Sequence, residues 1–218
     1  MKPRGLVVFD LDGTLLRGPT VCEVLAVPLG RLDEMREFER LSPDDQEGIV
    51  RMRAEIARWY AEVSREQLLD SLNAVEWAPG VREGIVRLRE ASIEVAIASI
   101  TWKVAVDWCA AKLGVTRTLG TAHEDDRCIE HVWPTDKAMW LRELSAALAI
   151  PRERTAGVGD SASDIPMLQA AGLGVFVGRQ PPPGLECVHL PAAGIDEVAR
   201  TILERWDLGR YNRAATVG

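Results

Sequence analysis

The sequence of 218 residues lacks paired cysteines, runs of basic residues and long apolar segments. Its four cysteines stand far apart without a C-x-x-C spacing, so neither a disulfide framework nor a zinc site is indicated. The net charge is −7 and the basic residues are scattered, which argues against nucleic acid or an anionic membrane surface as the main partner. No apolar run approaches the roughly 20 residues of a membrane-spanning helix.

The amino-terminal residues carry no sign of a targeting segment. Met1 to Gly5 lead into an apolar run that is typical of a strand and not of a signal peptide. Together with the unpaired cysteines, this favours a cytoplasmic protein that does not act at a membrane. Neither composition nor charge indicates an oligomeric state.

Two aspartates follow the first apolar run. Residues 6–9 are all apolar, which is the pattern of a strand covered on both faces in a parallel sheet. Asp10 then stands at the carboxyl end of that strand, where open α/β sheets build their ligand sites, and Asp12 comes two residues later. Gly13 allows a sharp turn directly behind them. One carboxylate could attack an electrophile while the other transfers a proton.

The character of the chain changes after this motif. Between Pro19 and Trp77 there is no strand-like run, and charged residues alternate with apolar ones at helical spacing. Ser64 and Gln67 match a capping box at the start of one of the expected helices. We therefore expect a small helical bundle inserted after the first strand.

From Trp77 onward, apolar runs typical of strands alternate with helical patterns. Strands are expected at 93–98, 155–160 and 174–178, and a short strand with a hairpin or exposed loop at 118–131. Helices are expected at 102–113, 137–148, 164–171 and 195–206. This alternation predicts an α/β fold with a doubly wound parallel sheet.

Ser99 directly follows the predicted strand 93–98. Its hydroxyl group and the next backbone N–H groups, beginning with that of Ile100, could hold phosphate oxygens. Ser99 and Thr101 are equally suited to cap the helix that begins near Trp102, and the two roles are compatible.

Two further polar clusters stand at helix starts. Lys137 begins a predicted helix. Most lysines at helix starts are simply solvated, but the helix dipole disfavours a cation at this end, so a lysine here calls for a reason. Asp160 and Asp164 are four residues apart at a strand-to-helix junction, so that both can face one cation. Carboxylate oxygens suit Mg²⁺, and the alternative is an acidic helix start that the dipole stabilises.

Taken in order, these clusters resemble the motifs of the haloacid dehalogenase (HAD) superfamily of phosphohydrolases. Asp10-Leu-Asp-Gly-Thr-Leu resembles motif I, Ser99 motif II and Lys137 motif III. Gly159-Asp160-Ser-Ala-Ser-Asp164, with the Pro-Met-Leu that follows, resembles motif IV of the phosphoserine phosphatase-like subgroup.

The resemblance implies the domain organisation and the chemical class. A doubly wound, Rossmann-like HAD core would comprise residues 1–16 and 78–218, and residues 17–77 would form a helical C1-type cap. The chain would be a Mg²⁺-dependent phosphomonoester hydrolase that acts on a small phosphorylated metabolite through an aspartyl phosphate.

The resemblance also assigns roles to residues. Asp10 would attack phosphorus, and Asp12 would protonate the leaving group and then activate water. Mg²⁺ would be held by Asp10, the backbone carbonyl of Asp12 and Asp160, while Asp164 would orient these ligands. Three residues would bind the phosphoryl group: Ser99, Ile100 and Lys137.

Other activities stay open at this point. The same aspartyl phosphate would serve a phosphotransferase or mutase, and the chain could be a phosphoserine phosphatase proper. A non-catalytic binding protein on the same scaffold is a third alternative, against which the presence of all four motif acids argues.

The position that holds a cap glutamate in phosphoserine phosphatases is occupied by Pro19, with Glu23 one helical turn beyond. An ammonium group without a carboxylate partner is costly to desolvate in a closed pocket. Ile100 and Thr101 also follow Ser99 where those enzymes have glycines. We therefore expect that L-phosphoserine is not the best substrate, unless Glu23 takes the place of the cap glutamate.

Arginines of the helical segment offer another contact for the substrate. Arg51 or Arg53 could receive a carboxylate or a second phosphate group, because guanidinium binds both. A solvated helix face fits these two arginines better, and we expect that role.

Overall fold

The computed structural model describes residues 2–41 and 45–208. In this part of the chain a seven-stranded sheet has the order β6-β5-β4-β1-β7-β8-β9. Neighbouring strands are parallel except for the β5–β6 pair. The strands are β1 (Gly5–Phe9), β4 (Ile93–Trp102), β5 (Arg117–Glu124), β6 (Arg127–Glu130), β7 (Thr155–Gly159), β8 (Leu173–Phe176) and β9 (Val188–His189). The predicted doubly wound α/β fold is confirmed.

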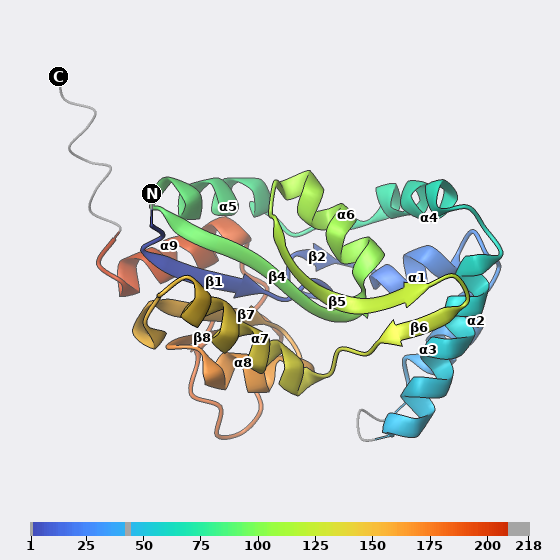
Figure 1. Ribbon diagram of the computed structural model, residues 1–218. Coiled ribbons are helices and arrows are strands. Elements are labelled where there is room, and N and C mark those ends of the chain that lie inside the picture. The colour runs from blue at the N-terminus through green and yellow to red at the C-terminus, as the bar shows by residue number, and fades with distance from the viewer. Residues whose placement is uncertain (1, 42–44, 209–218) are drawn as a thin grey trace.

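Helices cover both faces of this sheet (Figure 1). They are α5 (Val81–Glu90), α6 (Lys103–Leu113), α7 (Pro134–Ala147), α8 (Ile165–Ala170) and α9 (Ile195–Arg205). Side chains alternate between the two faces of the sheet along β1. Leu6 and Val8 pack on one face against apolar residues of α7 and α8. Val7 and Phe9 point the other way, into the larger cluster that contains α5, α6 and α9.

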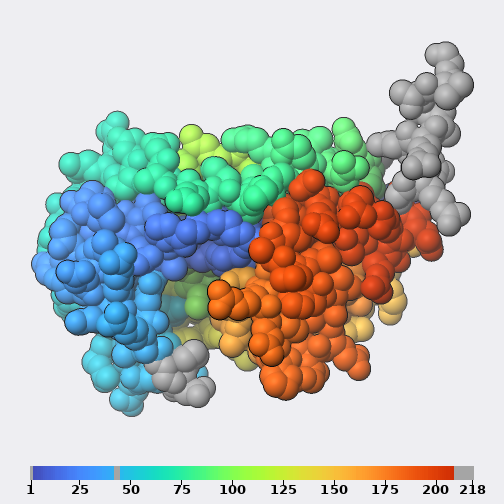
Figure 2. Space-filling model, turned by 180° about the vertical axis from the view of Figure 1, so that it is seen from behind, coloured from blue at the N-terminus to red at the C-terminus, as the bar shows by residue number. Residues whose placement is uncertain are grey.

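Residues between the first two core strands form helices, as predicted. They are α1 (Val21–Ala26), α2 (Leu32–Phe38), α3 (Gln46–Ala61) and α4 (Arg65–Ser71). They lie at the end of the molecule toward which β1 and β4 point (Figure 1). Ser64 and Gln67 form both hydrogen bonds of the predicted capping box. Seen from the other side, the blue and cyan surface of α1–α3 lies beside the orange and red surface of the carboxyl-terminal third (Figure 2).

Two short strands connect these helices to the sheet. β2 (Leu16–Arg17) pairs with β3 (Glu76–Trp77) in antiparallel orientation. No strand was predicted between Pro19 and Trp77, and β3 differs from that expectation by a two-residue element. Elements this short have no periodicity that a sequence pattern can reveal.

β4 is longer than predicted, and this changes the place of Ser99. The strand continues to Trp102, with an irregular register between Ala98 and Trp102, so Ser99 lies within it and does not follow it. Trp102 is the N-cap of α6, and no side chain makes a capping hydrogen bond there. The expectation that Ser99 or Thr101 caps this helix is therefore wrong.

The other predicted helices and strands of the core lie within a few residues of their predicted bounds, whereas β9 was not predicted. The segment after the short strand of residues 118–122 is a hairpin, in which β5 pairs with β6. Within the described residues, no helix is both long and apolar enough to cross a membrane.

Candidate active site

Asp10 directly follows β1 in the middle of the sheet. Phe9 lies opposite Ile97 of β4 on one side and Val158 of β7 on the other. The N–H of Asp10 donates a 2.9 Å hydrogen bond to the carbonyl of Val158, which continues the pairing with β7 by one residue. The buried carboxylate of Asp10 therefore projects at the carboxyl end of β1, between β4 and β7.

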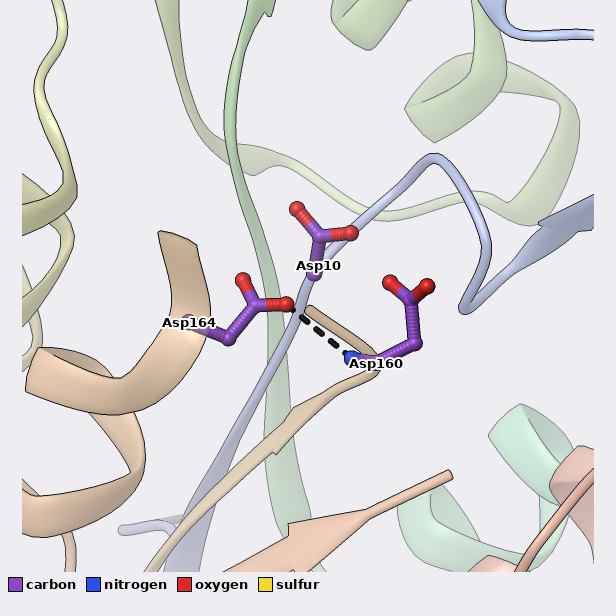
Figure 3. A group of neighbouring side chains, drawn as sticks. All are labelled: Asp10, Asp160 and Asp164. Atoms are coloured by element: carbon purple, nitrogen blue, oxygen red, sulfur yellow. Dashed lines mark hydrogen bonds between the residues drawn. The ribbon is translucent and has the colours of Figure 1, made fainter. Parts of the chain in front are cut away.

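Asp160 and Asp164 meet Asp10 at this edge. One carboxylate oxygen from each of the three lies within 4.8 Å of the others. Figure 3 shows Asp10 at the end of its strand with the carboxylates of Asp160 and Asp164 on either side. The predicted proximity of Asp10 and Asp160 is thus present in the structure.

Two glycines make this approach sterically feasible. A Cβ atom at Gly13 would lie 2.2 Å from the Asp160 carboxylate, and Gly13 has a φ of +77° that other residues rarely adopt. A Cβ atom at Gly159 would lie 2.4 Å from the Cβ of Asp164. Both glycines are therefore needed to bring the carboxylates close together.

Lys137 is completely buried in the first turn of α7. Its Nζ lies 2.6 Å from Oδ1 of Asp10 and 2.5 Å from Oδ1 of Asp164. The expectation for an ordinary lysine at a helix start, a solvated side chain, does not hold here. The ammonium group lies between the two acids and ties α7 to β1 and to the turn before α8.

The two oxygens of Asp164 are both engaged by protein donors. Oδ1 accepts from Lys137, and Oδ2 accepts from the backbone N–H of Ser161 at 3.1 Å. Oδ2 also accepts from the backbone N–H of Asp160 at 3.0 Å, as Figure 3 shows. Ser161 Oγ also donates to Oδ2. Asp160, by contrast, accepts one side-chain hydrogen bond, from Thr14 at 3.3 Å, among the residues described. Asp164 therefore accepts the capping hydrogen bonds at this turn and also contacts a cation, the ammonium group of Lys137.

The buried charges of this cluster do not balance. Three carboxylates and one ammonium group carry a net charge of −2 when all are ionised. Burial, followed by the charge of Asp164, raises the pKa of Asp10. Burial, again with the charge of Asp164, raises the pKa of Asp160 to about 6. Burial alone would lower the pKa of Lys137, but the attraction of Asp10 and Asp164 outweighs it and raises that pKa.

Asp12 points toward the helical segment. Its Oδ1 accepts a 2.7 Å hydrogen bond from the backbone N–H of Val21, the first residue of α1. Burial raises the pKa of Asp12 to about 7, although the hydrogen bond from Val21 acts in the opposite direction. A carboxyl group in this environment can both donate and accept a proton near neutral pH.

Ser99 is buried, and its Oγ accepts a 3.2 Å hydrogen bond from the N–H of Thr101. The hydroxyl hydrogen therefore stays available for another acceptor. The carbonyl of the next residue, Ile100, accepts hydrogen bonds from Thr121 Oγ1 at 2.8 Å and from Arg53 at 3.2 Å. These contacts hold the Ile100–Thr101 peptide, directly after Ser99, near the carboxyl end of β4.

Arg53 differs from the sequence-based expectation. Its residue is 5% exposed, whereas the side chain of Arg51 on the same helix is 73% exposed, as expected for a solvated face. Arg53 donates to the carbonyls of Ile100 and Val132, and its Nη1 lies 3.2 Å from Nδ1 of His131. Helical spacing could not reveal this environment, because the covering residues come from β4 and from the segment before α7.

Glu23 is already engaged within the helical segment. Its Oε1 accepts a 2.8 Å hydrogen bond from Arg36, and its Oε2 accepts from the backbone N–H of Thr20 in a capping box. In this structure Glu23 therefore does not supply the carboxylate that is missing at the position of Pro19.

Comparison with known proteins agrees with this arrangement. The family model described as haloacid dehalogenase-like hydrolase matches residues 7–169. A phosphoserine phosphatase of Streptomyces coelicolor is 30% identical over 196 residues, which are 83% of this chain and 45% of that protein. One of Albidiferax ferrireducens is 25% identical over 209 residues, 88% of this chain and 87% of that protein.

A solved structure with a similar fold is a phospho-aspartyl intermediate analogue of phosphoserine phosphatase. It has a TM-score of 0.69 and 22% sequence identity, and the match covers 93% of this chain and 99% of that chain. This chain spans less than half the length of the Streptomyces coelicolor relative.

Proposed function

Because the chain belongs to the haloacid dehalogenase-like hydrolases, we propose that it is a phosphomonoester hydrolase that acts on a small phosphorylated metabolite. The observation that carries this proposal is the position of Asp10, whose buried carboxylate contacts the ammonium group of Lys137 at the carboxyl end of the central strand β1. A nucleophile, a fixed positive charge and a cluster of acids are thereby combined in one place.

Asp10 forms a covalent intermediate in this proposal. One of its carboxylate oxygens attacks phosphorus, and the bond between phosphorus and the ester oxygen breaks with its electrons on that oxygen. Asp12 gives a proton to the departing oxygen. Asp12 then takes a proton from a water molecule, whose oxygen attacks phosphorus and releases the carboxylate of Asp10. The environment of Asp12, partly buried with a raised pKa, supports the exchange of a proton in both steps.

The acids fit Mg²⁺ as the metal cofactor. Carboxylate oxygens are its preferred protein ligands, and a divalent cation would offset the net charge of −2. Asp10, Asp160 and the backbone carbonyl of Asp12 would hold it. Asp164 would orient these residues, since protein donors already occupy both of its oxygens. Bound Mg²⁺ would supply positive charge to the phosphoryl oxygens.

The phosphoryl group would be bound by three residues of the core. Ser99 offers its hydroxyl hydrogen, which the contact with Thr101 leaves available. The N–H of Ile100 and the ammonium group of Lys137 would complete the contacts. Lys137 as a compact point charge suits a group whose negative charge is spread over several oxygens.

The helices of residues 17–77 would act as a cap over a core of residues 1–16 and 78–218. Their position beyond the ends of β1 and β4 supports this division (Figure 1). A cytoplasmic location stays a prediction, which the four free cysteines favour.

Hydrolysis of phosphoserine is a second candidate, favoured by the names of the relatives. Pro19 and the engaged Glu23 argue against it as the preferred reaction. A phosphotransferase or mutase would use the same residues and differs only in the acceptor.

The proposal predicts metal-dependent phosphate release from p-nitrophenyl phosphate. Turnover should stop in excess EDTA and return when Mg²⁺ is restored, because the acids alone repel the anionic substrate. L-Phosphoserine measured in the same assay tests the second candidate, and added glycerol as acceptor reveals any transfer. Undiminished turnover in excess EDTA would contradict the proposal.

A further inference from the structure

His131 directly follows β6 and belongs to none of the four sequence motifs. Its Nδ1 lies 3.2 Å from Nη1 of Arg53 and 3.5 Å from Sγ of Cys128. Its ring is stacked on that of Trp133, with the centroids 5.9 Å apart. The imidazole group therefore contacts α3, β6 and the residue before α7.

Arg53 carries a buried charge, and the described residues offer it no carboxylate within ion-pair distance. Its side chain donates to the carbonyls of Ile100 and Val132 and contacts the ring nitrogen of His131. A buried guanidinium group is usually paired with an acid, so each neutral acceptor carries more weight here.

The contact with Arg53 fixes the protonation state of His131. A guanidinium group has N–H donors and no acceptor, so Nδ1 must accept and the proton of the neutral ring lies on Nε2. A proton on Nδ1 would place a second positive charge and an N–H group opposite Arg53. Burial, followed by the charge of Arg53, lowers the pKa of His131 accordingly.

Three other titratable groups surround this pair. Cys128 of β6 touches His131, and Cys22 of α1 and Asp136 of α7 act on the charge of Arg53. Burial raises the pKa of both thiols, which keeps them uncharged at neutral pH. The Asp136 carboxylate accepts from the N-cap backbone of α7. His131 is therefore the group beside Arg53 that gains charge when the pH falls below neutral.

Arg53 connects this cluster to the candidate active site. The carbonyl of Ile100 directly follows Ser99, and that of Val132 comes just before α7, which carries Lys137. Both segments would bind the phosphoryl group, so a displacement of Arg53 would loosen both of them.

We propose that His131 is a positioning residue whose neutral imidazole holds Arg53 against these two carbonyls, and that protonation of His131 releases Arg53 and weakens phosphoryl binding. This inference rests on the proposed function, since the segments concerned are those that would bind the phosphoryl group.

NMR spectroscopy of ¹⁵N-labelled histidine tests the contact without any turnover. The chain has three histidines, and His131→Asn identifies the signals of His131 by their loss. We expect the Nε2–H tautomer at pH 8 and a pKa below the ordinary 6.5. Arg53→Met should raise this pKa, because it removes the neighbouring positive charge. A proton on Nδ1 at pH 8, or a pKa that Arg53→Met leaves unchanged, would overturn the inference.

The pH dependence of kcat/KM for p-nitrophenyl phosphate tests the effect on the site. The amide oxygen of His131→Asn stands one bond beyond Cγ, as Nδ1 does, and accepts without being protonated. At pH 8 this variant should stay within about twofold of the wild type. Its kcat/KM relative to the wild type should then rise about threefold or more between pH 8 and pH 5. This ratio cancels the titration of Asp12 and Asp160, which both proteins share.

A second variant shows whether His131 acts through Arg53. His131→Leu removes the acceptor, so kcat/KM at pH 8 should fall about threefold or more, mainly through KM. In the Arg53→Met background the same change should have no further effect. His189→Asn is the matched control on β9, at the opposite edge of the sheet from β6, and should keep the wild-type pH dependence.

The results distinguish this inference from the proposed function. Wild-type turnover with a ratio for His131→Asn that stays constant from pH 8 to pH 5 would overturn the inference alone. Losses from His131→Leu and Arg53→Met that multiply in the double variant would also overturn it. Absence of turnover by the wild type would overturn the proposed function and this inference with it.

Discussion

Lys137 has no exposed surface, yet it carries a charge between Asp10 and Asp164. A lysine in this position is stable because the two acids offset the cost of its burial. The same contact leaves the cluster with excess negative charge, which a divalent cation would balance. The residue would therefore contribute both to folding and, in the proposed reaction, to phosphate binding.

Replacement of Lys137 separates these contributions. Lys137→Met keeps the length of the side chain but removes the ammonium group, so kcat should fall by about 100-fold or more, as for other lost transition-state contacts. Breaking a buried ion pair should cost about 3–5 kcal/mol of unfolding free energy. Urea unfolding with and without Mg²⁺ measures this loss, and Mg²⁺ should recover part of it. Activity within tenfold of the wild type would contradict the assignment.

The proximity of these acids was predictable from the sequence, whereas the surroundings of Arg53 were not. The carboxyl ends of parallel strands meet at one edge, so the positions of Asp10 and Asp160 follow from recognising two strands. Arg53 lies on a helix whose neighbours come from distant segments. Its environment depends on tertiary packing, which no local pattern encodes.

Among the elements, α3 makes the most extensive polar connection between the inserted helices and the core. Arg53 of this helix contacts the carbonyl of Ile100, next to Ser99, and that of Val132, just before α7. Its guanidinium group also lies 4.9 Å from the ring centroid of Trp133. One side chain thus touches both segments that would bind the phosphoryl group, so it acts as a positioning residue.

Loss of Arg53 should affect every substrate. Arg53→Met leaves the carbonyl of Val132 without this buried donor, at a cost of about 1–3 kcal/mol. A loss of this size lowers the Tm of a domain of this length by roughly 2–4 °C per kcal/mol. We expect kcat/KM for p-nitrophenyl phosphate to fall at least tenfold, measured alongside thermal unfolding.

Arg51→Met is the matched control, since Arg51 lies on the same helix and is exposed. Its Tm and kcat/KM should stay close to those of the wild type. Equal effects of the two substitutions would show that the contacts of Arg53 have no particular importance.

Element boundaries show where sequence patterns stop being informative. The helices and the central strands were predicted because their apolar residues repeat with a clear period. β9 and the β2–β3 pair have two residues each and escaped prediction. The extension of β4 through Ser99 was missed because polar residues follow its apolar run, although the backbone continues to pair with β5.

At the scale of the whole molecule, the parallel sheet and the inserted helices contribute different residues to the candidate site. The sheet collects Asp10, Ser99 and Asp160 at one edge, and α7 brings Lys137 to the same place. From the inserted helices, Arg53 contacts the carbonyls of Ile100 and Val132, next to Ser99 and before α7. The core would therefore determine the reaction, and the inserted helices would hold the segments that bind the phosphoryl group.

The central claim is that phosphate becomes attached to Asp10 and that Asp12 moves protons. Acid quenching during turnover of a ³²P-labelled substrate, followed by peptide mapping, measures the attachment directly. We expect label on the peptide that contains Asp10 in the wild type, and none with Asp10→Asn. Asp12→Asn should still accept label slowly from a substrate with a good leaving group and then release it poorly. Label on the Asp10→Asn protein, or none on the wild type while it turns over substrate, would contradict the account.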